Sequence, residues 1–294
     1  MLRRQKIILA LLDSAAKPLS RTMFVKLSFL LRAETEVGED STFYDFVPYQ
    51  FGPFSFVLYR EIEALKHQSY VVENDEKLAL AKPMAGEARR LIGDLPISVR
   101  SSVGLIASRH SSKAQRALVQ DVYARYPWYA TKSELADLLP ATLPPLPSAS
   151  PAVYTVGYER TSVDAFFDRL LRAGIRGIAD VRANPISRKY GFARTSLSGI
   201  AAKLGLAYRQ FPKLGIPSEE RSGLAGFSTY QTLLDRYERE MLPKQSAEVA
   251  ELSRIVEREP TALLCVEADI HWCHRTRLAK AVARETGLAI QHLT

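Results

Sequence analysis

Hydrophobic positions in the first half of the chain follow a helical period. Apolar side chains recur three and four residues apart over residues 3–15, 20–31 and 54–67, which predicts three amphipathic helices. Two short apolar runs, at residues 70–72 and 78–80, flank an Asn-Asp turn and predict a hairpin. Three helices followed by a hairpin is the order of a winged helix-turn-helix, so we expect a mostly helical, winged-helix-like domain here.

The second half of the chain alternates between strand and helix patterns. Strands are expected at residues 153–157, 175–181, 207–211, 261–266 and 289–293, and helices at 162–173, 196–204, 227–242, 245–258 and 274–286. Such alternation is typical of a parallel sheet with helices on both faces. We therefore predict a three-layer α/β domain of the flavodoxin or Rossmann type.

A proline-rich segment separates the two patterns. Residues 139–151 read LPATLPPLPSASP, and five prolines in this stretch exclude a helix or a central strand. Such a composition favours a semi-rigid extended linker. We place a binding domain at residues 1–139, the linker at 140–151 and a catalytic domain at 152–294.

The composition is that of a folded chain, with 47% hydrophobic and 24% charged residues. No apolar stretch is long enough for a transmembrane helix, so no membrane partner is expected. Only two cysteines occur, Cys265 and Cys273, which excludes a disulfide-stapled secreted domain and favours a reducing, cytoplasmic location.

The net charge of +8 and the isoelectric point near 9.4 are compatible with a polyanionic partner. Residues 151–294 carry 21 basic and 16 acidic side chains, and 16 of these basic residues are arginines. Arginine suits bidentate contacts to phosphate. Nucleic acid, with DNA favoured, is therefore the expected partner, although a GC-rich genome would also enrich arginine. The sequence leaves the oligomeric state open.

Polar and titratable side chains follow several predicted strands of the second domain. The candidate site residues are Gly157, Tyr158, Asp180, Arg182, Ser187, Arg188, Tyr190, Glu267, Cys273, His274 and Arg275. Because ligands collect at the carboxyl ends of the strands in such sheets, we expect these residues to converge on one edge.

This set of residues suits hydrolysis or group transfer at a nucleotide. Glu267 or Asp180 is the candidate general base or nucleophile, and His274 is the candidate acid. Arg182 and Arg275 are expected to hold a phosphate, helped by the helix that begins nearby. Alternatively, Asp180 and Arg182 pair with each other or with Arg275 in a buried ion network.

The loop at residues 183–195 places Arg188 and Lys189 next to Tyr190. Basic side chains interleaved with aromatic ones suit a nucleic-acid strand, because charges pair with the backbone and bases stack on rings. An ordinary solvated loop is the alternative.

The two cysteines do not match the sequence pattern of a metal site or of a thiol enzyme. The chain has no C-x-x-C pair, so we expect no metal ion and no other cofactor. A thiol phosphatase is excluded because position 279, where its arginine would stand, is Ala279. Cys265 is expected to be a small buried strand residue.

Residues 153–293 resemble the domain-of-unknown-function family 488. The resemblance rests on Thr155, Gly157, Asp180, Arg182, Pro185, Cys265, Glu267, Cys273, His274 and Arg275. It implies an α/β fold and these site residues, but it does not imply a reaction. One departure is Tyr158-Glu159, where many relatives have His-Ser.

Residues 5–80 resemble the Panacea-type domains. The shared residues are Pro48, Tyr49, Gly52, Pro53, Phe54 and Ser55. This resemblance implies a small helical, winged-helix-like module for protein or nucleic-acid contacts.

Together these features predict a DNA-binding hydrolase, in particular one that removes a modified or damaged base as a DNA glycosylase does. Such an activity would serve DNA repair or phage defence. One alternative is a non-catalytic DNA-binding regulator or antitoxin-like nucleotide sensor. Another is a hydrolase or transferase that acts on free nucleosides.

Overall fold

The computed structural model describes residues 1–223 and 226–294, and these form two compact units, Met1–Pro145 and Leu146–Thr294. The division falls inside the segment predicted as the linker, and residues 140–151 form no helix or strand. None of the helices in the described part of the chain is both long and apolar enough to cross a membrane.

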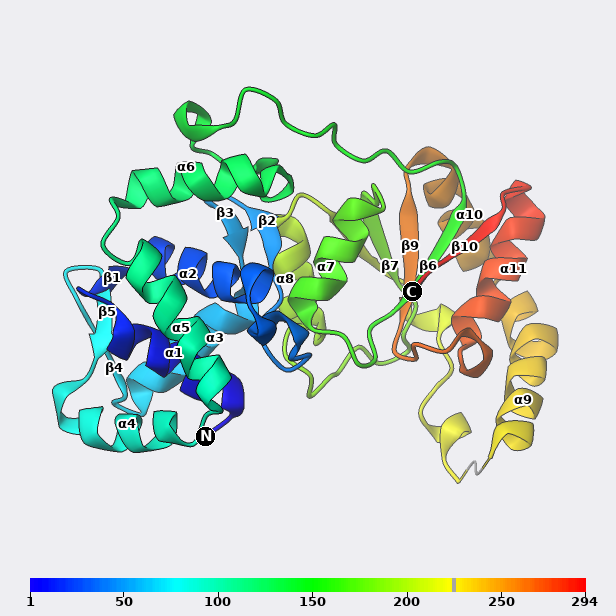
Figure 1. The fold of residues 1–294 in the computed structure, drawn as a ribbon. Coiled ribbons are helices and arrows are strands. Elements are labelled where there is room, and N and C mark those ends of the chain that lie inside the picture. The colour runs from blue at the N-terminus through cyan, green and yellow to red at the C-terminus, as the bar shows by residue number, and fades with distance from the viewer. Residues whose placement is uncertain (224–225) are drawn as a thin grey trace. The chain divides into compact units, whose positions relative to one another are not determined.

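The N-terminal unit is built mainly from helices (Figure 1). Its elements are α1 (Arg3–Ser14), β1 (Leu19–Ser20), α2 (Arg21–Glu34), β2 (Val47–Tyr49), β3 (Gly52–Phe54), α3 (Phe56–His67), β4 (Val71–Asn74), β5 (Lys77–Leu80), α4 (Ala85–Gly93), α5 (Ile97–His110) and α6 (Gln115–Arg125). Strands β1, β5 and β4 form an antiparallel sheet in that order. Three helices with this small sheet give the winged-helix-like arrangement that the sequence predicts.

The third helix begins later than predicted. Residues 52–54 are not helical, because β3 pairs with β2 in a short hairpin. Ser55 then caps α3, and its Oγ accepts a hydrogen bond from the backbone N–H of Leu58 at 3.1 Å. Pro48 and Pro53 lie opposite each other in the hairpin, so neither interrupts a longer sheet.

The C-terminal unit alternates strands and helices. Its elements are β6 (Val153–Gly157), α7 (Val163–Arg172), β7 (Gly177–Asp180), α8 (Arg194–Lys203), β8 (Ala207–Gln210), α9 (Phe227–Arg236), α10 (Ser246–Arg258), β9 (Thr261–Cys265), α11 (His274–Thr286) and β10 (Ile290–Leu293). The predicted α/β class is confirmed. The helix predicted at residues 227–242 ends earlier, at Arg236, and a π-helical segment, Tyr237–Met241, follows it.

The five strands form one parallel sheet in the order β10-β6-β9-β7-β8. Helices α7 and α8 lie on one face, and α10 and α11 lie on the other (Figure 1). The chain therefore leaves the neighbouring strands β6 and β9 toward opposite faces of the sheet. The carboxyl ends of β6, β9 and β7 form the edge where sheets of this kind bind ligands.

Candidate functional site

The ends of β6, β7 and β9 bring the predicted site residues together. Gly157 is paired with Cys265, and Asp180 is paired with Leu264. The backbone N–H groups of Tyr158 and Glu159 both donate to the carbonyl of Val266, at 3.1 and 2.9 Å. The loops after β6 and β9 are therefore tied to each other.

Gly157 allows this close approach. A Cβ atom at this position would lie 2.0 Å from the carbonyl oxygen of Glu267, which is far inside van der Waals contact. Arg275 is buried and donates to the carbonyls of Glu267 and Ala268, the latter at 3.2 Å. Both residues therefore fix the loop that carries Glu267, and Arg275 points its guanidinium at this loop.

Asp180 and Arg182 form a buried ion pair, which is the alternative that the sequence left open. Asp180 is 0% exposed and Arg182 is 3% exposed. The Nε of Arg182 donates to Asp180 Oδ1 at 2.7 Å, and its Nη2 donates to Oδ2 at 2.5 Å. The Tyr208 hydroxyl also donates to Asp180 Oδ2, at 2.6 Å. Burial and this bond raise the pKa of Tyr208 well above its ordinary value.

The remaining guanidinium nitrogen of Arg182 supports Tyr158. Its Nη1 donates to the Tyr158 hydroxyl at 3.2 Å and to the carbonyl of Phe192 at 2.9 Å. The Tyr158 ring stacks on Phe192, with centroids 4.2 Å apart and planes 10° apart. Since Tyr158 is 5% exposed, it belongs to the wall that supports the site.

The loop between β7 and α8 holds the other predicted binding residues. Ser187 Oγ accepts the backbone N–H of Lys189 at 3.2 Å, and Lys189 Nζ donates to the Tyr158 carbonyl at 2.9 Å. Burial lowers the pKa of Lys189, and the charge of Glu159 opposes this shift. Tyr190 is half-buried, whereas Arg188 is exposed. Among these residues, Arg188 is the one that faces solvent.

Glu267 is the partly exposed carboxylate among the predicted site residues, whereas Asp180 is buried. Its Oε2 accepts from the Cys265 thiol, with Sγ 3.1 Å away. Burial tends to raise the pKa of Glu267, but hydrogen bonds from Cys265, from its own backbone and from Cys273, together with the charge of His274, bring it below its ordinary value.

His274 is buried, and both of its ring nitrogens face protein atoms. Nε2 lies 3.0 Å from the carbonyl oxygen of Val181, and Nδ1 lies 3.5 Å from Cys265 Sγ. Cys273 is also buried, and burial next to Cys265 raises the pKa of its thiol well above the ordinary value. The ligand atoms of Cys265, Cys273 and His274 all lie within 4.8 Å of one another. We refer to these three residues as the thiol–imidazole cluster.

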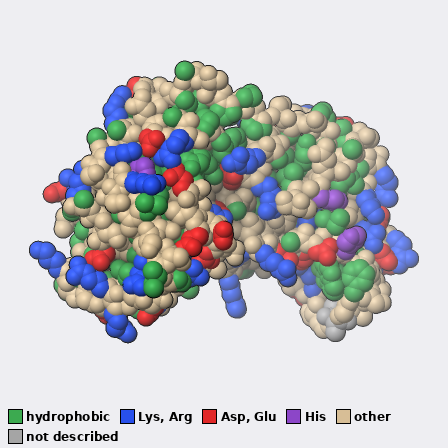
Figure 2. Space-filling model, in the orientation of Figure 1, with side chains coloured by type: hydrophobic (Ala, Val, Ile, Leu, Met, Phe, Trp, Pro, Cys, Tyr) green, Lys and Arg blue, Asp and Glu red, His purple; other side chains and the backbone are tan. Residues whose placement is uncertain are grey.

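A pocket of about 300 Å³ opens beside this cluster. Its lining residues are Gln231, Leu234, Ile270, His271, Cys273, Thr276, Arg277, Lys280 and His292. None of these described lining residues is acidic, although Arg277 also pairs with Asp235 at 2.8 Å and Glu238 at 3.3 Å. Figure 2 shows histidine side chains beside basic ones on this unit. The pocket is therefore suited to an anionic group.

Of the predicted site residues, Cys273 is the one that lines this pocket. Sequence reasoning missed the others. One available signal was the spacing of Arg277 and Lys280, which places two basic side chains on one side of α11. His292, in β10, hydrogen-bonds Thr155 Oγ1 at 2.7 Å. Burial and the charges of Arg275 and His271 lower the pKa of His292.

Three aromatic residues of the C-terminal unit form a group that was not predicted. The rings of Phe227 and Trp272 are 5.1 Å apart, and those of Tyr230 and Trp272 are 5.4 Å apart. Phe227 is 51% exposed and Trp272 is 36% exposed. Burial and the charge of Glu267 raise the pKa of Tyr230 well above its ordinary value, so the phenol lies within the field of that carboxylate. A tryptophan beside Cys273 in a polar loop was the signal available in the sequence.

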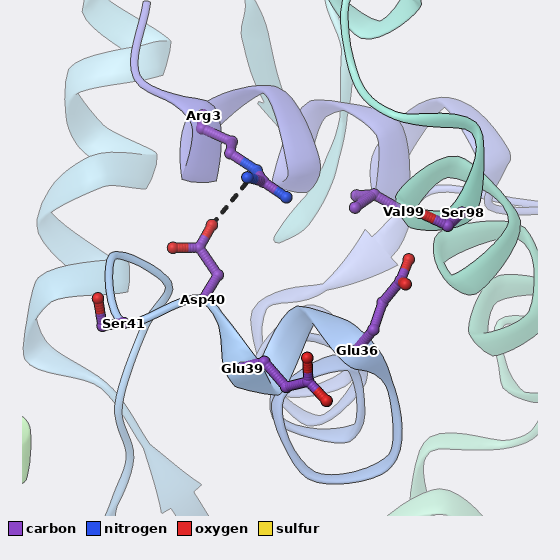
Figure 3. Close-up of a pocket in the computed structure, with 7 residues that line it drawn as sticks. All are labelled: Arg3, Glu36, Glu39, Asp40, Ser41, Ser98 and Val99. Carbon is purple, nitrogen blue, oxygen red and sulfur yellow. Dashed lines mark ion pairs between the residues drawn. The ribbon is translucent and has the colours of Figure 1, made fainter.

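The N-terminal unit has a pocket that is lined mainly by acidic and polar side chains. Its volume is about 370 Å³, and Glu36, Glu39 and Asp40 line it with Arg3, which pairs with Asp40 at 3.3 Å (Figure 3). Three carboxylates around one arginine do not suit a phosphate group.

Basic side chains of the N-terminal unit are largely engaged within it. Arg21 and Lys66 each pair with Glu63 and Glu73, and Lys26 is buried against the carbonyl of Pro53 at 3.0 Å. DNA binding by this unit therefore stays a prediction.

The fold and the strand-end site define a parallel α/β domain that follows a winged-helix-like unit. Residues 162–282 match the family model described as a domain of unknown function, DUF488. This match runs from the cap of α7 into α11 and contains the Asp180–Arg182 pair, Glu267 and the thiol–imidazole cluster. The family resemblance of the C-terminal part is thus confirmed, while the Panacea-type resemblance of the N-terminal part stays a prediction. Neither a curated protein nor a solved structure matches the chain.

Proposed function

We propose that the C-terminal unit is a hydrolase that cleaves the N-glycosidic bond of a nucleotide within nucleic acid, with DNA the favoured substrate. The observation that carries this proposal is that Glu267, a partly exposed carboxylate, acts on Tyr230, which neighbours the exposed rings of Trp272 and Phe227, while a pocket with basic lining residues opens beside Cys273. A nucleotide presents the matching groups, namely a base, a sugar and a phosphate. The activity would be cytoplasmic and would serve base repair or defence against phage.

The two exposed aromatic residues support the recognition of a base. Phe227 and Trp272 offer ring faces on which a base removed from the helix can stack, and such stacking contributes about 1–3 kcal/mol per base. Lys280, at the neighbouring pocket, is exposed and supplies a charge for a phosphate. The aromatic rings and Lys280 would then hold the base and the phosphate of one nucleotide.

Glu267 would assist attack of water on the sugar. The bond between C1′ and the base nitrogen breaks, and the base leaves with the electron pair and takes a proton from solvent. Water adds to C1′ and gives its proton to the Glu267 carboxylate, which also stabilises the developing positive charge on the sugar. The products are a free base and an abasic sugar.

Asp180 and His274 have other roles in this proposal. Both are buried, and their polar atoms are directed at protein groups. Asp180 positions Tyr158 through Arg182, and His274 belongs to the thiol–imidazole cluster. Glu267 is therefore the single carboxylate that we assign to the reaction.

The test is base release from duplexes that carry a panel of modified and damaged bases, measured by mass spectrometry. Glu267→Gln should lower release by at least about 100-fold while leaving DNA affinity within about threefold. The matched control is Glu251→Gln, at an exposed position of α10, which should leave both values unchanged. Lys280→Gln should weaken binding and reduce its salt dependence.

Two outcomes would overturn the proposal. Binding without release from any duplex would favour the non-catalytic regulator. Release from free nucleosides, with little dependence on salt, would favour the nucleoside hydrolase. Unchanged release by Glu267→Gln would remove the assigned role of this residue.

A further inference from the structure

We propose that the thiol–imidazole cluster, Cys265, Cys273 and His274, is a binding site for a soft divalent cation of the Zn²⁺ type. The sequence predicted no metal because the two cysteines are not in a C-x-x-C pair. The fold brings them together, since Cys265 ends β9 and Cys273 immediately precedes α11.

The ligand atoms are spaced closely enough for a tetrahedral zinc ion to fit after small shifts. With sulfur about 2.3 Å and nitrogen about 2.0–2.1 Å from the metal, two sulfur ligands lie about 3.8 Å apart, and a sulfur and a nitrogen lie about 3.6 Å apart. Cys265 Sγ and His274 Nδ1 are 3.5 Å apart, and all three ligand atoms lie within 4.8 Å of one another. Small side-chain shifts would bring the three atoms around one ion.

The histidine is already oriented as a ligand. The carbonyl oxygen of Val181 can only accept a hydrogen bond, so Nε2 of His274 carries the proton in the 3.0 Å contact between them. Nδ1 therefore presents its lone pair to Cys265. A ring nitrogen that donates to a carbonyl while the other faces the ligand position is the outer-shell arrangement typical of metal-binding histidines.

Three protein ligands leave a fourth position, as in catalytic zinc sites. The Glu267 carboxylate lies beside the cluster, with its Oε2 3.1 Å from Cys265 Sγ. The fourth position therefore lies on the side of Glu267. Two thiolates and an imidazole select Zn²⁺ over Mg²⁺ or Ca²⁺, which prefer oxygen ligands. On binding, each thiol gives its proton to solvent.

This inference does not depend on the proposed hydrolase activity, because cation binding is measured directly. The reduced full-length protein is loaded with equimolar Zn²⁺ or Co²⁺. Metal content is then measured by mass spectrometry, and the Co²⁺ form by absorption. Because the chain has only two cysteines, a sulfur-to-cobalt charge-transfer band can come only from Cys265 or Cys273. We expect about one ion per chain and the spectrum of a tetrahedral site.

Cys265→Ser, Cys273→Ser and His274→Gln should each lower zinc affinity by about 100-fold or more. The matched control is His271→Ala, which removes an exposed histidine three residues before His274 and should change affinity by less than about twofold. If a variant does not fold, the wild-type chain still decides the question. Zinc should raise its melting temperature and slow alkylation of both cysteines.

Fewer than about 0.1 ions per chain under reducing conditions, with no charge-transfer band, would overturn the inference. Metal binding that is unchanged in Cys265→Ser would overturn it as well. Loss of base release with metal binding intact would instead count against the hydrolase alone.

Discussion

Replacing Arg182 by methionine tests whether the buried pair with Asp180 is part of the framework or part of the ligand site. The substitution removes both donors to Asp180, the donor to the Tyr158 hydroxyl and the donor to the Phe192 carbonyl. It leaves the Asp180 carboxylate fully buried, with the Tyr208 hydroxyl and one backbone N–H as its donors.

Removing one partner of a buried ion pair costs about 3–5 kcal/mol, because the other charge stays buried without compensation. We expect Arg182→Met to lower the free energy of unfolding of the C-terminal unit by this amount. With a urea dependence of about 2 kcal/mol per molar, the midpoint should fall by about 2 M. Asp180→Asn should have a similar cost, and the double substitution should cost about 2 kcal/mol less than the sum.

The two tryptophans make the assay specific for one unit. Trp128 lies in the N-terminal unit and Trp272 in the C-terminal unit, so Trp128→Phe leaves one fluorophore that reports on the C-terminal unit. The control is Arg209→Met. This arginine forms an exposed pair with Glu259, so the substitution should cost less than about 1 kcal/mol.

If Arg182→Met costs no more than Arg209→Met, the reasoning about the buried pair is refuted. Normal stability with weakened DNA affinity would return Arg182 to the substrate-binding role expected from the sequence.

Two further predictions concern backbone packing and pH. Gly157→Ala should displace the Glu267 carbonyl, lower the free energy of unfolding by about 1–3 kcal/mol and reduce base release by about 100-fold. The control is Gly199→Ala, on the open side of α8, which should cause none of these losses. Lys26 is 2% exposed, and burial lowers its pKa to about 7 from an ordinary value of 10.5. Its favourable contribution to the free energy of unfolding is therefore complete above pH 10.5 and is lost as the pH falls to about 7. Between pH 9 and pH 7 the N-terminal unit should lose about 2 kcal/mol, measured through Trp128 in a Trp272→Phe background. Lys26→Met should remove this dependence of the free energy of unfolding on pH, whereas Lys77→Met, at an exposed position, should leave it unchanged. An equal pH dependence in wild type and Lys26→Met would contradict the burial argument.

The sequence predicted the strands and helices of the C-terminal unit well because their hydrophobic periods are regular and their ends carry caps and glycines. It also placed Asp180, Arg182 and Glu267 at one edge, since parallel strands end together. It left open whether Asp180 and Arg182 neutralise each other or bind a ligand, because this depends on burial, which spacing does not report. The hairpin at Val47–Phe54 was missed because the phenylalanines after Gly52 also fit a helical pattern.

The pocket beside α11 was missed for a topological reason. His292 is in the last strand and Gln231 is in α9, and they line one pocket because β10 pairs with β6 at the far side of the sheet from β8. Hydrophobic periodicity does not predict the order of the strands in a sheet. The thiol–imidazole cluster likewise depends on how the loop between β9 and α11 turns back on the strand ends.

The position of β9 between β6 and β7 has a consequence for folding during synthesis. Among the strands of the described residues, β6 pairs with β9 and β10, so its first strand partner comes more than a hundred residues later in the chain. At about 5–20 residues per second, the first strand of the unit waits roughly 5–20 s on the ribosome. Such non-local pairing slows folding. The nascent chain must therefore keep a strand that is fully buried in the folded unit from aggregating until its C-terminal partners emerge.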